Sequence, residues 1–438
     1  MTKPILTAKR SRNSEKRECG TRAASLGAQS RSHFLMKILL INTLYPPSTV
    51  GGAERSLEVL AKGLVDANCD VSVICLSGTG DATEVREGVT VHRLAHANRY
   101  WPFDGQRRRA VERLRWHGND AMTSPRQCRI EQILAEFDPD IVHTNNLTGF
   151  GSGLIPLINK YRLPLVHTLR DFSLICSRAS IFKNLQDCET RCLSCRVLTA
   201  SKSASATGID MVVGNSAYMV DRHRDFGLFQ NTPSRVIFNA VPGILDERPF
   251  VADIASPAEL TIGFAGAIKP EKGIEVLLEA LRIAGPGPWK LQIAGKGDDE
   301  YVSTLRNSYA DLPIEWLGFV PIQPFLEGLD LMVIPSIWPE PMPRTLIEAM
   351  AMRLPVLVSD AGGSPEVATM YSGAQLYERR DIDGLATLLK TAIAEPPARP
   401  VADRDALETF TVERLTANYL QAYGDTIAMK HPRKTDHA

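Results

Sequence analysis

Two glutamates, Glu340 and Glu348, stand eight positions apart in the segment PSIWPEPMPRTLIEAMAMRLPVLVSDAGGSP. Carboxylates there can accept hydrogen bonds from the vicinal hydroxyl groups of a sugar or a ribose. The Gly362-Gly363 turn and a helix N-terminus beside the two acids offer backbone N–H groups to a phosphate. These residue types predict a site for a sugar or nucleotide ligand. The alternative is that both acids belong to an ordinary solvated helix face.

The elements expected around the two acids are strand, loop, helix, strand and glycine turn. LMVI at 331–334 and PVLV at 355–358 are short continuous apolar runs, typical of strands that are buried on both faces of a parallel sheet. Residues 345–352 are good helix formers with apolar positions at helical spacing. Both acids should therefore lie near the carboxyl ends of neighbouring strands, where open α/β sheets bind ligands.

This segment resembles the Glu-x7-Glu signature of family 4 glycosyltransferases, which are retaining enzymes of the GT-B fold that use a nucleotide-sugar donor. WPEP before the signature, EAMA around its second acid and SDAGGSPEV after it carry the resemblance, which extends over about residues 36–430. By this resemblance Glu348 would hold the donor ribose and Glu340 would contact the transferred sugar in a catalytic role. The backbone of Gly362 and Gly363 would bind phosphate or sugar.

Strand and helix patterns alternate along the chain, which argues for βαβ units and parallel sheets. Residues 36–241 are expected to form a Rossmann-like acceptor domain, and residues 258–410 a Rossmann-like donor-nucleotide domain. Residues 242–257, rich in Pro, Asp and Glu, read as the linker. The predicted fold class is α/β: two doubly wound domains that face a central cleft, as in GT-B. In the resembled family the final helix, here at 411–430, returns to the first domain.

The expected strands of both domains are short. In the first domain they cover residues 37–42, 70–76, 90–94, 141–143, 165–168, 211–214 and 234–241. In the second they cover residues 260–265, 290–294, 314–317, 331–334, 355–359 and 374–376.

Gly266 follows an expected strand and leads into AIKPEKG, in which Lys272 opens the next helix. A glycine turn lets a diphosphate approach closely, and an ammonium group supplies positive charge. In the resembled family an Arg and a Lys share this task. Lys272 matches the Lys, but Ala267 replaces the Arg, so Lys269 or Arg344 would have to compensate. The alternative for Lys272 is a solvated lysine at a helix start.

The first domain offers a second glycine pair in the loop YPPSTVGGAE, just before a helix. Gly51 and Gly52 allow the backbone to approach a ligand at the helix N-terminus. The loop resembles the Gly-Gly loop that faces the donor across the cleft in family 4. A flexible turn without a ligand is the alternative.

Polar residues end two further strands of this domain. Asn145 stands where the resembled family commonly has the second His of His-x-His, which makes Asn145 a candidate sugar contact and His143 a structural histidine. Arg170 and Asp171 follow the next strand, in place of a His-Asp pair. They could position acceptor or phosphate, or pair with each other.

Four cysteines occur within one short stretch, in the pattern Cys-x11-Cys-x3-Cys-x2-Cys: Cys176, Cys188, Cys192 and Cys195. Such a set could hold a structural zinc ion as four thiolate ligands. Reduced free thiols and redox or disulfide use are the alternatives. A catalytic zinc is not expected, because four protein ligands leave no open position.

Composition narrows the function classes. Lys plus Arg and Asp plus Glu are 50 each, so nothing global favours nucleic-acid binding. No apolar run approaches the roughly 18 residues of a membrane span. Residues 1–35 lack a signal-peptide core and read as a basic, disordered tail, with Met36 as a candidate start. We expect a cytoplasmic protein. A basic stretch, with arginines at 107–109, 113 and 115, is either a solvated helix or a peripheral contact with an anionic membrane.

The function expected by resemblance is transfer of a hexose from a UDP- or GDP-linked donor to a hydroxyl of a glycan or a lipid-linked acceptor. It would serve polysaccharide or glycoconjugate biosynthesis and need no cofactor for its chemistry. One alternative is an inactive, glycosyltransferase-like partner subunit, because Ala267, Pro343 and Asn145 depart from the family pattern. Another is a GT-B epimerase or hydrolase, which would need catalytic acids in the first domain.

Overall fold

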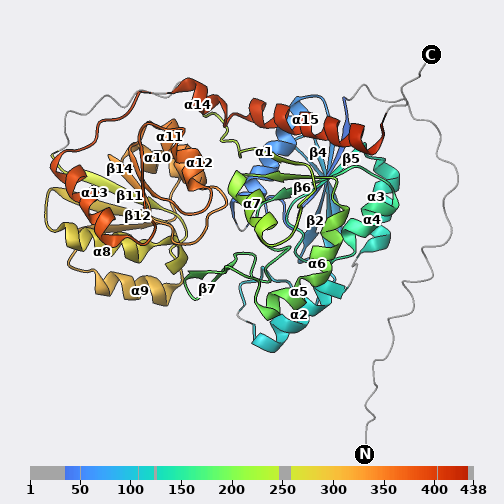
Figure 1. Cartoon of the computed structure of the whole chain (residues 1–438), viewed down its shortest axis with the longest axis horizontal. Helices are drawn as coiled ribbons and strands as arrows, with labels where there is room; N and C mark the ends of the chain where they lie inside the picture. Colours follow the sequence, from blue (N-terminus) through green and yellow to red (C-terminus); the bar gives the residue numbers. More distant parts are fainter. Residues whose placement is uncertain are drawn as a thin grey trace, which may run out of the picture.

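The computed structural model describes residues 35–49, 51–106, 108–122, 126–245, 258–401 and 403–432. Two lobes, each built around its own sheet, lie side by side (Figure 1). Residues 1–34 of the tail expected over 1–35, the greater part of the expected linker (246–257) and Arg107 of the basic stretch lie outside the described residues.

The first lobe contains a sheet in the order β10-β9-β6-β5-β1-β2-β4-β3. All its neighbours pair in parallel except β3 with β4, which are antiparallel. The strands are β1 (Lys37–Ile41), β2 (Asp70–Ser77), β3 (Ala82–Arg86), β4 (Val89–Ala95), β5 (Ile141–Thr144), β6 (Leu165–Leu169), β9 (Met211–Gly214) and β10 (Ser234–Val236). A separate hairpin joins β7 (Phe182–Lys183) and β8 (Gln186–Asp187).

The second lobe contains a fully parallel sheet in the order β13-β12-β11-β14-β15-β16. Its strands are β11 (Leu260–Ala265), β12 (Trp289–Ala294), β13 (Ile314–Gly318), β14 (Leu331–Ile334), β15 (Val356–Ser359) and β16 (Ala374–Tyr377). The strand order reverses between β11 and β14. In a doubly wound sheet the crevice beyond the carboxyl ends of these two strands is the expected ligand site.

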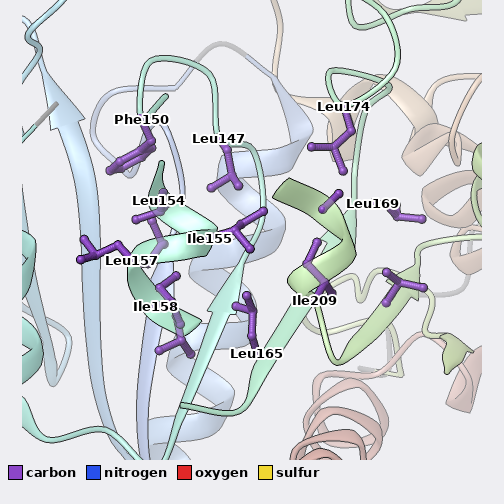
Figure 2. Close-up of a cluster of buried hydrophobic side chains, with 14 of the residues drawn as sticks. Leu147, Phe150, Leu154, Ile155, Leu157, Ile158, Leu165, Leu169, Leu174 and Ile209 are labelled. Atoms are coloured by element: carbon purple, nitrogen blue, oxygen red, sulfur yellow. The ribbon is translucent and has the colours of Figure 1, made fainter. Parts of the chain in front are cut away.

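Helices cover both faces of each sheet because the strands are apolar on both sides. On β1, Ile38 and Leu40 join the core cluster that contains helix α1, whereas Leu39 and Ile41 join the cluster that contains helices α3 and α4. Figure 2 shows side chains of α4 gathered with Leu165 of β6 in the second of these clusters.

The helices of the first lobe are α1 (Gly52–Asp66), α2 (Ala110–Met122), α3 (Gln127–Phe137), α4 (Leu154–Lys160), α5 (Leu193–Leu198), α6 (Ala200–Ser205), η1 (Ala206–Gly208) and α7 (Ala217–Asp225). Those that follow are η2 (Pro270–Lys272), α8 (Ile274–Ala284), α9 (Asp299–Ser308), α10 (Ile322–Glu327), α11 (Arg344–Ala351), α12 (Ser364–Ala368), α13 (Ile382–Ala394), α14 (Arg404–Glu408) and α15 (Val412–Lys430).

Helix α15 returns to the first lobe and packs along α1 (Figure 1). The hydroxyl of Tyr423 on α15 lies 2.7 Å from Nδ1 of His143, and Nε2 of the same ring lies 2.7 Å from Oγ1 of Thr168. His143 is fully buried. Its ring therefore joins the final helix to strands β5 and β6, in the structural role that the sequence favoured.

The strand expected over residues 234–241 is too long, because regular pairing ends at Val236. Its neighbour β9 ends at Gly214, whose carbonyl accepts one more hydrogen bond, from the amide of Ile237. Beyond that point the described part of the chain supplies no partner strand on this edge. Ile244, in the described beginning of the expected linker, instead packs in the core of the second lobe.

Candidate active site

The carboxyl edges of the two sheets face each other across a cavity of about 390 Å³. Residues that follow the strands of the first sheet line one side: Thr43, Asn146, Thr148, Arg170, Asp171, Asn215 and Asn239. Residues that follow β14 line the other side: Trp338, Pro341, Met342 and Arg344. The cleft predicted between the two domains is therefore lined by polar groups of the first lobe.

A second cavity of about 230 Å³ lies at the carboxyl ends of β11 and β14, where the strand order reverses. Gly266 and Lys272 line it after β11, and Ser336 and Glu340 line it after β14. Gly52 of the first lobe lines both cavities, as do Met342 and Arg344, so the two cavities adjoin.

Lys272 and Glu340 form an ion pair within the smaller cavity. The Nζ of Lys272 lies 2.5 Å from Oε1 of Glu340, and that oxygen also accepts a hydrogen bond of 2.5 Å from Oγ of Ser336. The Glu340 side chain is only 9% exposed, and the Lys272 ammonium lies 5.4 Å from the centre of the Trp338 ring. An ammonium group that can bind an anion thus lies beside a carboxylate that can accept a hydrogen bond from a hydroxyl group.

Arg344 opens helix α11 and lies between the two cavities. Its Nη2 is 3.5 Å from Oε1 of Glu348 one turn later, whereas its Nη1 is buried and has no hydrogen-bond partner among the described residues. A Cβ at Gly52 would lie 3.5 Å from the Arg344 side chain, an ordinary van der Waals distance, so the start of α1 lies next to Arg344 of the other lobe. Glu348 itself lines neither of these two cavities. It stands behind Arg344 on the same helix.

The Gly362-Gly363 turn packs against the backbone of the Glu340 loop. Gly362 has a φ of 62°, and a Cβ there would lie 2.2 Å from the carbonyl oxygen of Glu340. The amide of Gly363 donates a hydrogen bond of 2.8 Å to that same carbonyl. This amide is therefore engaged by the protein, and the two glycines shape the loop that presents Glu340.

Glycines also shape the turn after β11. A Cβ at Gly295 would lie 1.8 Å from the carbonyl oxygen of Gly266, so the turns after β11 and β12 are in backbone contact. On the first lobe, Gly51 precedes α1, and its amide donates to Oε2 of Glu54 over 3.0 Å. Glu54 thereby makes the acidic half of a capping box at the helix end that faces the cleft.

Arg170 is held by two asparagines at the floor of the larger cavity. Its Nε donates to Oδ1 of Asn145 over 2.7 Å, and its Nη1 donates to Oδ1 of Asn239 over 2.8 Å. Burial lowers the pKa of Arg170 from its ordinary value. Asn145 is 1% exposed and lines neither cavity. In the structure Asn145 therefore orients Arg170, and its neighbour Asn146 lines the larger cavity.

Asp171 lines the same cavity as Arg170, but the two do not engage each other in the way that the sequence allowed. One carboxylate oxygen of Asp171 accepts a hydrogen bond of 2.8 Å from the amide of Ser173. Burial raises the pKa of the Asp171 carboxyl above its ordinary value. The first-lobe side of the cleft thus carries an oriented guanidinium and a partly buried carboxyl group.

The four clustered cysteines lie at the base of the β7–β8 hairpin. The sulfurs of Cys176 and Cys195 are 3.9 Å apart, and Cys192 Sγ lies 3.2 Å from Oγ of Ser194. The Ser194 hydroxyl lowers the pKa of the Cys192 thiol to about 7. Within the described ranges, no three His, Cys, Asp or Glu side chains are placed so that they could share a metal ion.

Three residues near the site were not singled out by the sequence. Ser336 donates to Glu340, as described above. The carboxylate of Glu366 crosses between the lobes and accepts hydrogen bonds of 2.7 and 2.8 Å from the first two amides of α7. Ser216, the N-cap of α7, donates over 2.6 Å to the carbonyl of Pro341. The serine before α7 was a readable helix-start signal, but nothing local indicated its partner in the other lobe.

Two family models match the chain. One, described as Glycosyltransferase Family 4, matches residues 50–242, and the other, Glycosyl transferases group 1, matches residues 259–395. The two matched segments correspond to the two lobes.

Individual proteins are similar over most of the chain. An uncharacterized 42.6 kDa protein in the cps region of Klebsiella pneumoniae is 28% identical and covers 89% of this chain and 100% of its own length. The putative teichuronic acid biosynthesis glycosyltransferase TuaC of Bacillus subtilis is 23% identical, with coverage of 86% and 94%. The structure of Anabaena HepE in complex with UDP shares the fold, with a TM-score of 0.65, 18% identity and coverage of 89% and 100%.

Proposed function

The chain is a family 4 glycosyltransferase of the GT-B fold, and on this premise we propose that it transfers a hexose, with retention of configuration, from a UDP- or GDP-linked donor to a hydroxyl of a glycan or lipid-linked acceptor. The Lys272–Glu340 pair in the cavity beyond β11 and β14 carries the proposal. The UDP bound by HepE supports UDP as the nucleotide. The teichuronic acid assignment of TuaC supports a glycan product.

In this proposal the donor diphosphate lies against Lys272 and Arg344. Both side chains line the smaller cavity, and the N–H groups on the buried Nη1 of Arg344 can donate hydrogen bonds to a phosphate oxygen. Glu340 accepts a hydroxyl of the transferred sugar, while Arg170 and Asp171 face the acceptor from the first lobe. The bond from the sugar to the diphosphate breaks as the acceptor oxygen bonds to the sugar on the same face, and a phosphate oxygen takes the acceptor proton. Positive charge aimed at the leaving group is the principal contribution of the protein.

The function is tested by incubating the protein with UDP-glucose, UDP-galactose, UDP-glucuronate and GDP-mannose and measuring release of the nucleoside diphosphate. A glycosyltransferase should hydrolyse one donor slowly even without its acceptor. An inactive partner subunit would release no diphosphate from any of them. An epimerase would convert the nucleotide sugar without release. Either of the last two outcomes would overturn the proposal.

Glu348→Ala is expected to weaken binding of the nucleoside diphosphate by about 1–3 kcal/mol, because a hydrogen bond between a ribose hydroxyl and a charged group is lost. Calorimetry should show the same loss with the free nucleoside, which lacks phosphate. Arg344→Ala should instead weaken binding of the diphosphate alone. Glu300→Ala on the exposed face of α9 serves as the control. Unchanged nucleoside affinity in folded Glu348→Ala would remove the ribose assignment.

None of the helices in the described ranges has both the length and the apolar character needed to cross a bilayer.

We also propose that the acceptor side makes peripheral contact with an anionic membrane through neighbouring helices α2 and α5. Apolar side chains are exposed on both, including Leu114 (57%) and Leu193 (77%). Exposed arginines lie among them: Arg109, Arg113, Arg115 and Arg196. A surface that combines apolar and basic groups suits anionic lipid headgroups.

In co-sedimentation, vesicles with anionic lipid should capture the protein, and Leu114→Glu with Leu193→Glu should reduce the bound fraction several-fold. Val85→Glu places the same change at an exposed apolar residue on β3 and should have no effect. Equal capture of both variants, or equal capture by neutral vesicles, would contradict membrane docking.

For the cysteine cluster we propose a structural zinc ion, whose binding would draw the sulfurs of Cys188 and Cys192 toward the Cys176–Cys195 pair, since the described side chains do not yet form a set of three ligands. Four Zn–S bonds of about 2.3 Å in a tetrahedron place the sulfurs about 3.8 Å apart. The 3.9 Å between Cys176 and Cys195 is compatible with this spacing.

Elemental analysis should find about one zinc per chain, and chelation should lower the melting temperature. Cys192→Ser should lose the metal, whereas Cys128→Ser outside the cluster should keep it. Metal-free protein of full stability, purified without chelator, would leave reduced thiols as the explanation.

A further inference from the structure

The β7–β8 hairpin of the first lobe reaches across to the second lobe. Its two-residue turn, Asn184 and Leu185, has φ values of 52° and 58°, which suit a tight hairpin turn. The Leu185 carbonyl accepts a hydrogen bond from Arg380, whose guanidinium also lies 5.8 Å from the centre of the Phe182 ring. In Figure 1, β7 lies between the two lobes.

An ion pair fixes this contact. Both carboxylate oxygens of Asp187, at the end of β8, accept hydrogen bonds from the Arg379 guanidinium, with 3.2 Å between Nη1 and Oδ1. The Arg379 and Asp187 side chains are 30% and 24% exposed. The bond to Asp187 raises the pKa of Arg379 further above its ordinary value. The hairpin is thus attached to the residues that follow β16 by a planar, two-bond contact.

Arg379 contacts not only the hairpin but also the loop that carries Glu340. Its Nη1 lies 3.5 Å from the carbonyl oxygen of Ile337, and its backbone amide donates over 2.9 Å to Asp360 after β15. On the other side of the same loop, the amides of Ile337 and Trp338 both donate to the carbonyl of Glu271, next to Lys272. The segment between β14 and α11 is therefore held from the Lys272 side and from the Arg379 side.

We propose that Asp187 and Arg379 are positioning residues: together they latch the hairpin onto the second lobe and hold the Ile337–Glu340 loop in its donor-binding position. The inference rests on the proposed function for its catalytic consequence, but the latch itself is a contact between lobes. Breaking it should favour an open cleft and lower the population that binds donor. Each lobe keeps its own core, so stability should change little.

The test uses Asp187→Asn, Arg379→Gln and the double variant in the full chain. We expect each to weaken binding of the nucleoside diphosphate selected by the donor screen, and to raise the KM for its sugar donor, by about fivefold, the scale of a partly exposed ion pair. The double variant should lose no more than Arg379→Gln alone, because Arg379→Gln already removes the ion pair that Asp187→Asn breaks. Asp187→Glu should restore part of the affinity. Melting temperatures should be unchanged.

Glu58→Gln provides the matched control, because Glu58 pairs with Arg86 within the first lobe at exposures of 27% and 39%. Small-angle X-ray scattering without any ligand supplies an independent measurement: the latch variants should show a larger radius of gyration than the wild type and the control. Unchanged scattering, or affinity losses that multiply in the double variant, would overturn the latch. Wild-type protein that releases diphosphate from no donor would overturn the proposed function and leave the scattering result to decide the latch.

Discussion

Lys272→Ala is expected to lower turnover by about 100-fold or more, which corresponds to about 2.7 kcal/mol of transition-state stabilisation. Lys272 is the cation that lies in the small cavity beside Glu340, and no arginine stands at position 267 to share the charge of the departing diphosphate. Steady-state kinetics with the selected donor measure the loss. The choice among donor sugars should stay as in the wild type, because the lysine acts on the diphosphate.

Lys290→Ala is the control for this variant, since Lys290 lies near Glu259 and Glu315 on the same lobe but lines neither cavity. Arg344→Ala tests whether charge is shared. If the two cations act on one diphosphate, the effects of Lys272→Ala and Arg344→Ala should not add independently in the double variant. Folded Lys272→Ala with wild-type turnover, alone and combined with Arg344→Ala, would remove these two cations from the mechanism.

The sequence predicted the centre of this site because its signals are local. Lys272 and Glu340 each follow a short apolar run, and both runs proved to be strands on either side of the reversal in strand order. The carboxyl ends of such strands meet at one edge, so the two charges had to converge. The hydrogen bond from Ser336 to Glu340 depends on the course of the loop and could not be inferred from residue types.

Burial of polar residues was harder to predict. Asn145 and Asn146 both follow β5, and only Asn146 lines the larger cavity, whereas Asn145 is buried. Likewise, Gly362 and Gly363 looked like free phosphate donors, but a φ of 62° at Gly362 and the hydrogen bond from Gly363 tie them to the Glu340 loop. Such contacts depend on tertiary packing between segments that are distant in sequence.

The α/β fold class and the glycosyltransferase family predicted from the sequence are confirmed. Strands buried on both faces are the easiest elements to recognise, and the expected ranges 260–265 and 331–334 agree with β11 and β14. The strands at the two edges of the first sheet were harder to predict. The antiparallel β3 is largely exposed and has no apolar run, and β10 ends where its single neighbour ends.

The departures from the family pattern each have a local explanation in the structure. Asn145 holds Arg170, which itself stands in the place of a histidine. Pro343 is the N-cap of α11, just before the first helical residue, Arg344. Ala267 lines the small cavity, and so does Arg344. Arg344 thus supplies a positive charge at the cavity where Ala267 replaces the usual arginine. For this reason the active-enzyme proposal is preferred to an inactive subunit.

Acidification below about pH 6.5 is expected to destabilise the protein steeply, because three histidines of the first lobe are buried in neutral form. Burial lowers the pKa of His167 to about 3 and that of His223 to about 4, and it lowers the pKa of His143 well below its ordinary value. In the unfolded chain each has a pKa of about 6.5. As the pH falls below that value, the histidines become protonated in the unfolded state but stay neutral in the folded state. The free energy of unfolding therefore falls.

The expected slope approaches about 4 kcal/mol of unfolding free energy per pH unit between about pH 6 and pH 5, since each histidine contributes up to about 1.4 kcal/mol per unit. Urea unfolding at pH 7.5, 6.0 and 5.0 measures it. His223→Gln should reduce the slope by about a third, because the amide can still donate to the Met219 carbonyl that Nδ1 of His223 contacts over 2.7 Å, but it does not titrate. An unchanged slope in this variant would show that other groups, such as carboxylates, dominate the acid response, and that His223 is not held neutral.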